Sequence, residues 1–183
     1  PGGVSKNVKV KDAIRNHQIY GLAGNMEDWS VAGAYWAGPM KIGSKSERPT
    51  TYTNLVVEEA PANPYGYNTR GILNVMGYKV VFDGFTFDLS ETGGTESIQR
   101  IFSDQRGIYF DEEGGNVYKD GLIKLSPERS IALTSNASPH APITFKNVTV
   151  EDNGGGVVLG KNFSNHSYNY VFENFEVVPK GGA

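Results

Sequence analysis

The most constraining feature of this sequence is a short phrase that occurs twice near its C-terminal end. Residues Ile143–Val150 and Tyr170–Val177 both alternate apolar and polar residues on either side of a central asparagine. Alternation with a period of two is typical of a strand with one buried face. Asparagine enters the left-handed backbone conformation more easily than most residues. Each phrase therefore predicts two strands joined by a sharp corner, at Asn147 and at Asn174.

The same phrase recurs upstream in more degenerate form, which indicates a repeat along most of the chain. The corner is Asn, Asp or Gly in every copy, and these residue types tolerate a positive φ angle. Successive corners lie 21, 26, 30, 36, 27 and 27 residues apart, and repeats of this length are typical of solenoid proteins. In the copy at Val117–Leu125 we expect the phase to be shifted by roughly one residue. The predicted corners are Asn7, Asp28, Asn54, Gly84, Asp120, Asn147 and Asn174.

Between two corners the sequence predicts a strand, a loop, a middle strand, a second loop and a strand that leads to the next corner. Three short strands per repeat predict an all-β fold, a right-handed parallel β-helix of about seven coils. An antiparallel sandwich also uses short strands at regular spacing, but most of the intervals are too long for hairpins. The expected middle strands are Gln18–Leu22, Met40–Gly43, Gly71–Val75, Arg100–Phe102, Ile131–Leu133 and Val157–Leu159.

A single coil cannot bury its own apolar side chains, so the core of such a fold forms between coils. Aligning the repeats predicts four inward rows of side chains. Asparagines at the corners are expected to hydrogen-bond from coil to coil and to satisfy buried backbone groups. The predicted rows are Val80, Ile143 and Tyr170; Phe82, Phe145 and Phe172; Phe85, Val148 and Phe175; and Phe87, Val150 and Val177.

Composition limits the classes of protein that remain. A chain of 183 residues predicts one domain over residues 1–183, with 23 glycines that suit a protein of strands and turns. A net charge of −3 gives no reason to expect nucleic acid as a partner. No stretch approaches the length of a membrane helix, so no membrane insertion is expected. The absence of cysteine excludes disulfides and thiolate chemistry.

From Asn7 to Val178 the repeated phrases resemble the coils of the pectate-lyase-like, right-handed parallel β-helix superfamily. That superfamily contains polysaccharide lyases, glycoside hydrolases, esterases, epimerases, phage tailspikes and non-catalytic surface proteins, so the resemblance leaves the function open. Many members carry a capping helix at the first coil, whereas only six residues precede Asn7 here. This departure predicts a segment of a longer solenoid, or coil ends covered by another subunit, because open sheet edges invite pairing.

The resemblance implies that any catalytic residues lie on the middle strands, where the candidates are Lys41, Arg100 and Asp104. Lyases of this type use a Lys or Arg base beside acidic calcium ligands, and glycoside hydrolases use two carboxylates that face one groove. The paired Asp motifs of the family's hydrolases and the Asp/Arg set of its esterases are not found. The alternative is that the three residues are solvated polar side chains on a strand face.

Two aromatic loops and one acidic loop are candidate binding sites. Exposed aromatic rings with polar neighbours can stack on sugar rings, and the alternative is that they fold back over the coil. Oxygen ligands from the acidic loop would suit calcium, and the alternative is a solvated loop. The carbohydrate-binding candidates are Tyr35, Trp36, Tyr65 and Tyr67, and the calcium candidates are Asp111, Glu112, Glu113, Asn116 and Asp120.

Sequons for N-glycosylation occur at Asn136, Asn162 and Asn165, and a fourth match at Asn147 coincides with a predicted corner. Taken together, the sequence predicts an extracellular or cell-surface β-helix module with a structural, adhesive or carbohydrate-binding role. Its expected partners are a polysaccharide or glycan and other copies of itself, as a homo-oligomer or by end-to-end stacking. The alternatives are a lyase or glycoside hydrolase that acts on acidic polysaccharide, and a segment of a phage or surface fibre.

Overall fold

Every regular element in the described part of the chain is a β-strand. The computed structural model describes residues 3–11, 24–34, 40–42, 50–59, 73–76, 80–88, 90, 102–105, 117–125, 131–135, 143–153, 157–159 and 170–181. In these ranges there is no helix with the length and apolar character needed to cross a membrane. The strands are β1 (Gly3–Lys6), β2 (Lys9–Val10), β3 (Gly24–Glu27), β4 (Ser30–Ala34), β5 (Met40–Ile42), β6 (Thr50–Thr53), β7 (Val56–Glu59), β8 (Leu73–Met76), β9 (Val80–Asp83), β10 (Thr86–Asp88), β11 (Phe102–Gln105), β12 (Val117–Lys124), β13 (Ile131–Ser135), β14 (Ile143–Asp152), β15 (Val157–Leu159) and β16 (Tyr170–Pro179).

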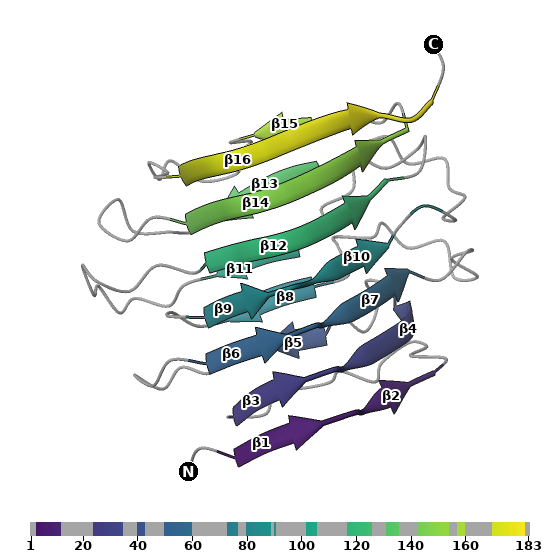
Figure 1. The fold of residues 1–183 in the computed structure, drawn as a ribbon, viewed down its shortest axis with the longest axis vertical. Helices are drawn as coiled ribbons and strands as arrows, with labels where there is room; N and C mark the ends of the chain where they lie inside the picture. The colour runs from purple at the N-terminus through teal and green to yellow at the C-terminus, as the bar shows by residue number, and fades with distance from the viewer. Residues whose placement is uncertain are drawn as a thin grey trace.

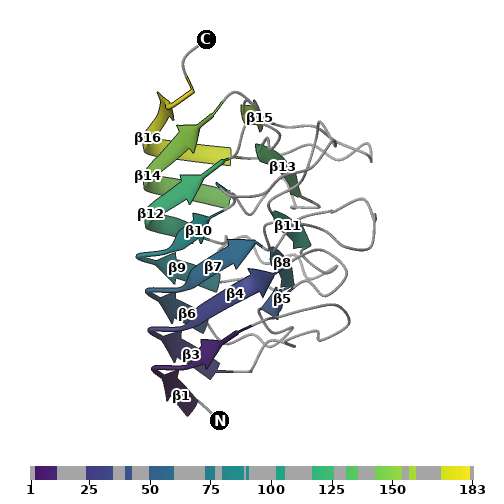
Figure 2. The same ribbon diagram turned by 90° about the vertical axis from the view of Figure 1, so that its right-hand side faces the viewer.

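The strands form two parallel sheets that face each other (Figures 1 and 2). The main sheet has 11 strands and does not close on itself; its order is β1-β3-β6-β9-β12-β10-β7-β4-β2, and β14 and then β16 continue from β12. The second sheet has five strands in the order β15-β13-β11-β8-β5. Because every one of these strand pairs is parallel, the antiparallel sandwich is excluded for the described residues.

The chain visits the two sheets in a repeating order, as the sequence predicts. It leaves a corner in β4, crosses the second sheet in β5 and returns to the main sheet in β6, and the strands β7, β8 and β9 repeat this order. Strands β5 and β15 coincide closely with predicted middle strands, whereas β8, β11 and β13 extend beyond the predicted ends to Met76, Gln105 and Ser135. The predicted strand Gln18–Leu22 lies outside the described residues.

All seven predicted corners are confirmed by the backbone. They are the residues with positive φ in the described part of the chain, with φ between 51° and 69°. The parallel hydrogen bonding continues through the corner: the Asn54 N–H donates to the carbonyl oxygen of Asp83 at 2.9 Å, and the Gly84 N–H donates to that of Lys119 at 3.0 Å. Neighbouring layers therefore stay in register on both sides of the bend. Because side chains alternate along a strand, this register keeps inward residues in line with inward residues of the next layer.

The corner side chains form a ladder of hydrogen bonds between layers. The Asn147 side-chain amide donates to Asp120 Oδ1 at 3.0 Å, and the Asn174 amide donates to Asn147 Oδ1 at 3.0 Å. A separate rung joins Asn54 to Asp28 Oδ1 at 3.0 Å. The predicted ladder is thus present, but the expectation that it satisfies buried backbone groups is wrong. Its rungs are exposed and join side chains, because neighbouring carbonyl groups already accept the corner N–H groups.

We expect the Asn147→Ala variant to be less stable than Asn147→Gly by about 1 kcal/mol, because only alanine pays the steric cost of a left-handed backbone. Both variants lose the same two rungs of the ladder, so glycine is the matched control for the lost hydrogen bonds. Equilibrium denaturation in urea would measure the difference. An alanine variant as stable as the glycine variant would contradict a strained corner at this position.

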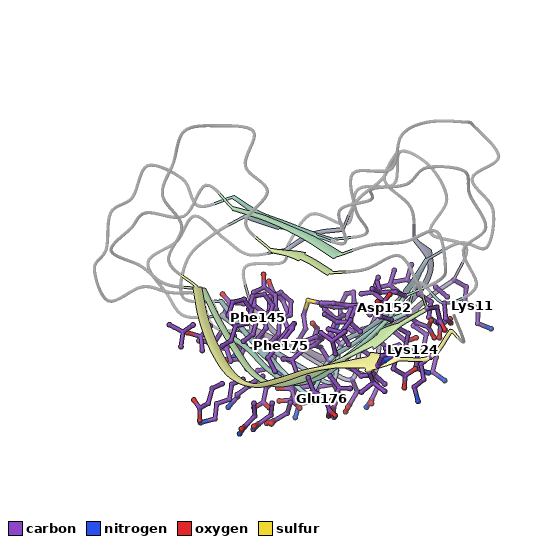
Figure 3. All side chains as sticks on the ribbon, turned by 90° about the horizontal axis from the view of Figure 1, so that it is seen from above. Lys11, Lys124, Phe145, Asp152, Phe175 and Glu176 are labelled. Atoms are coloured by element: carbon purple, nitrogen blue, oxygen red, sulfur yellow. The ribbon has the colours of Figure 1, made fainter. Side chains whose placement is uncertain are left out.

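The core lies on the concave side of the bent main sheet, where Phe145 and Phe175 point, while Glu176 lies on the convex side (Figure 3). One row of rings runs along the stack through β6, β9, β12 and β14. The ring centroids of Tyr52 and Phe82 are 5.4 Å apart, those of Phe82 and Tyr118 4.6 Å, and those of Tyr118 and Phe145 4.9 Å. The last two pairs are stacked and the first is tilted by 31°, and the spacing of the stacked pairs matches the distance between strands.

The predicted inward rows are confirmed for the inner layers and modified at the last one. Phe82, Phe145, Val148 and Val150 are buried, whereas Phe172 in β16 is 38% exposed because no described layer covers it. The side chains of the first predicted row (Val80, Ile143 and Tyr170) are not described. The backbone register of β14 and β16 does pair Ile143 with Tyr170. Phe85 and Phe87 are buried as well, and Phe175 is partly buried.

The phase shift predicted for the copy at Val117–Leu125 is wrong. Tyr118 is in register with both Phe82 and Phe145, which places Asp120 in line with Asn147 without any slip. The reason lies in the packing of the neighbouring layer. Gly121 occupies an inward position where a Cβ would overlap the ring of Phe85, so this layer substitutes glycine for an apolar side chain.

Candidate functional site

The structure describes two of the three candidate catalytic residues, and only by their place in the second sheet. Lys41 lies in β5 and Asp104 in β11, two strands away. Lys41 is in register with Asn74 of β8, which is in register with Ser103 of β11, so Asp104 occupies the adjacent register. Arg100 lies outside the described residues. The catalytic role of this set therefore stays a prediction.

The four aromatic candidates for carbohydrate binding, Tyr35, Trp36, Tyr65 and Tyr67, lie outside the described residues. The same holds for the sequons at Asn136, Asn162 and Asn165. The fourth match, Asn147, is described, and its side-chain amide takes part in the corner ladder as donor and as acceptor.

Of the calcium candidates only Asp120 is described, and Asp111, Glu112, Glu113 and Asn116 lie outside. Asp120 is an exposed corner whose carboxylate oxygen accepts the hydrogen bond from Asn147. In the described ranges no three His, Cys, Asp or Glu residues come together as metal ligands would. The structure thus assigns Asp120 a place in the corner ladder, and calcium binding stays a prediction.

The best described candidate surface is the convex face of the main sheet, where acidic and basic side chains form pairs. We call the residues in register with Lys6 the charged column. Within it, Lys6 Nζ lies 3.0 Å from Glu27 Oε2, Lys119 Nζ 3.3 Å from Asp83 Oδ2, and Lys146 Nζ 3.1 Å from Glu173 Oε1. The full column is Lys6, Glu27, Thr53, Asp83, Lys119, Lys146 and Glu173.

A second set of ion pairs lies on the far side of the corners. Lys124 Nζ is 4.0 Å from Asp88 Oδ2, and Lys180 Nζ is 3.8 Å from Glu151 Oε1. Every one of these five pairs joins adjacent layers of the stack rather than residues within one layer. Exposed ion pairs contribute only about 0–1 kcal/mol each to stability. Each pair favours contact between the two layers that it joins, but the charges alone do not set the register, because Lys119 and Lys146 are like charges in register with each other.

The two end layers of the described sheet complete this surface. Strand β16 pairs only with β14, and β1 pairs only with β3, so each leaves one edge without a described partner. The large apolar side chains that are exposed in the described part all come from these two strands: Val4 from β1, and Val171, Phe172 and Val177 from β16. Open edges were expected from the sequence, but the ion pairs that join adjacent layers were missed. An alignment of the outward-facing positions of the repeats would have revealed them.

Comparison of the chain with protein-family models, with curated proteins and with solved structures gave no match.

Proposed function

We propose that this chain is a structural module that acts outside the cell or at a cell surface. In this proposal it is a right-handed parallel β-helix of about seven coils with three short strands per coil. Its aromatic loops contact a polysaccharide or glycan. The module serves as a scaffold or adhesive element, and it carries out no reaction of its own.

The observation that carries this proposal is that the described side chains are used to join layers. Inward rings stack from strand to strand, corner amides bond from corner to corner, and the five ion pairs link neighbouring strands. A stack held along one axis in three independent ways is suited to bearing load and to presenting loops at fixed spacing. The register of the candidates Lys41 and Asp104, two strands apart and one position out of line, adds nothing that favours catalysis.

We expect the purified chain to bind members of a glycan array and to leave pectin, alginate and chondroitin intact when calcium is supplied. Sugar stacking by the aromatic loops predicts that Trp36→Ala weakens binding by at least about tenfold, since a stacked indole supplies much of the contact. The Asn162→Ala variant serves as a control outside the aromatic loops.

Release of unsaturated sugars that absorb in the ultraviolet would overturn the proposal in favour of a lyase. Its loss in Lys41→Ala or Asp104→Asn would then assign the reaction to the second sheet. A chain that binds no glycan on the array would remove the carbohydrate partner and leave only the scaffold.

A further inference from the structure

We propose that Asn147 carries an N-linked glycan, attached at the position of the one amide N–H that the corner ladder does not use. The inference rests on the proposed location of the chain outside the cell. The sequence has sequons at Asn136, Asn147, Asn162 and Asn165, and Asn147 is the one that the structure describes. Its place in the stack decides whether the folded chain can hold a glycan there.

Asn147 combines a corner amide with a hydroxyl group two residues later, at Thr149. The other asparagine corners lack this hydroxyl, and the other layers that have one lack an asparagine at the corner. The sequon is therefore a property of this layer and does not follow from the repeat. The remaining layers combine Asn7 with Lys9, Asp28 with Ser30, Asn54 with Val56, Gly84 with Thr86, Asp120 with Leu122 and Asn174 with Glu176.

Two hydrogen bonds of the ladder fix the orientation of the Asn147 amide. Its nitrogen donates to Asp120 Oδ1 in the preceding layer at 3.0 Å, and its Oδ1 accepts from the Asn174 amide in the following layer at 3.0 Å. The carbonyl group and the donating N–H therefore point in opposite directions along the stack. In a planar amide, the N–H that points this way is the one trans to the carbonyl oxygen. The cis N–H takes part in neither rung.

A glycosylated asparagine keeps the hydrogen that the ladder needs. Glycosylation replaces one of the two amide hydrogens with the anomeric carbon of the first sugar, which gives a secondary amide. A secondary amide, like the peptide bond, holds its remaining N–H trans to the carbonyl oxygen. That is the N–H that Asn147 donates to Asp120, so the sugar takes the cis position and both rungs are retained.

The surroundings of this corner give a sugar access to solvent. Asn147 is exposed, and so is Asn174, its neighbour in the next layer. Thr149 is in register with Glu176, which lies on the convex side of the main sheet, away from the core (Figure 3). Val148, between the two sequon residues, is fully buried. A glycan on Asn147 thus projects from the convex side while the core position next to it stays filled.

The sugar donor is an oligosaccharide linked to a lipid pyrophosphate, and a transferase of the secretory pathway catalyses the step. The Asn147 nitrogen forms a bond to the anomeric carbon. The bond from that carbon to the phosphate oxygen breaks, the lipid pyrophosphate leaves with the electron pair, and a base of the transferase takes one amide proton. Because Val148 is buried in the folded stack, the transfer precedes the packing of this layer.

The test is expression of the full chain behind a secretory leader in eukaryotic cells. Ser138→Ala, Ser164→Ala and Ser167→Ala remove the other three sequons. Peptide N-glycosidase in heavy-oxygen water converts a glycosylated asparagine to labelled aspartate, which mass spectrometry locates. We expect the secreted, folded chain to carry the label at residue 147. Thr149→Val removes the hydroxyl and leaves Asn147 in place, so it should lower the occupancy by at least about tenfold.

A second measurement tests whether the ladder is retained. An endoglycosidase trims the glycan to one N-acetylglucosamine, and we expect this form to melt within about 1 °C of the same chain made in bacteria that lack the transferase. Asn147→Asp is the matched control, because aspartate adopts the corner conformation, as Asp28 and Asp120 show. It cannot donate the hydrogen bond and sets a second carboxylate beside Asp120, so its melting temperature should fall by about 2–4 °C.

An unmodified Asn147 in the secreted, folded chain would overturn the inference. A glycan found only on unfolded chains retained in the cell would also overturn it, as would a trimmed form that melts as low as the Asn147→Asp variant. Each of these outcomes leaves the scaffold proposal standing, because glycan-array binding and polysaccharide cleavage are measured on the unmodified chain. Failure of those two assays would in turn leave the result at residue 147 unaffected.

Discussion

Replacing Phe145 with alanine is expected to lower the free energy of unfolding by about 3–5 kcal/mol, the usual range for a buried phenylalanine. Phe145 is only 1% exposed and lies between two other rings of the row, Tyr118 and Phe172. Its centroid is 4.9 Å from that of Tyr118 below and 5.6 Å from that of Phe172 above. Alanine would leave a cavity between two layers that are fixed in place by their backbone hydrogen bonds, so the cavity cannot easily collapse.

The matched control is Phe172→Ala, which removes the same side chain from the same row one layer further on. Phe172 is 38% exposed, so it loses less buried surface, and we expect less than half of the effect of Phe145→Ala. Equilibrium denaturation in urea at low protein concentration would measure both, with the slope checked for a change in cooperativity. Equal losses for the two variants would contradict the inward, layer-covered position of Phe145.

The corners could be predicted from the sequence because they depend on local properties. A positive φ restricts the residue type, and Asn54 or Asn147 shows that restriction whatever packs around it. The alternation on each side then fixes which residues face inward, as the burial of Phe82 and Val150 shows. The corners are 21 to 36 residues apart, and most of these intervals are too long for hairpin connections, so the spacing favours parallel stacking.

Register and exposure also depend on the neighbouring layers, and they could be predicted less well from the sequence. The phrase around Gly121 looks irregular in isolation, and the predicted phase shift placed its residues one position out of line. The structure shows that its register is regular and that the missing side chain leaves room for Phe85. The exposure of Phe172 likewise depends on what lies above it, which the pattern of its own strand cannot show. The candidate site residues in the loops remain predictions because they lie outside the described residues.

The close fit between Gly121 and Phe85 leads to the second large effect. The Gly121→Val variant is expected to lose about 3 kcal/mol of stability, at the upper end of what overpacking usually costs. Phe85 is only 2% exposed, and its ring stacks on Phe87 at 4.7 Å and meets Phe82 edge to face at 6.3 Å, so it has no room to move aside. Gly3→Val is the control, because a Cβ on Gly3 meets nothing within 4 Å, and this variant should be close to neutral.

A double-mutant cycle tests whether a side chain at residue 121 is destabilising because it overlaps the Phe85 ring or for another reason. Gly121→Ala and Phe85→Leu should each destabilise the protein, the first by overlap and the second by an unfilled space. Combined, the smaller leucine makes room for the added methyl group, so the double variant should be more stable than the sum of the single changes predicts. Residues in contact typically show coupling of about 0.5–3 kcal/mol in such cycles. Strictly additive losses would mean that Gly121 is required for a reason other than the Phe85 ring, and the assignment of this layer's inward position would have to be revised.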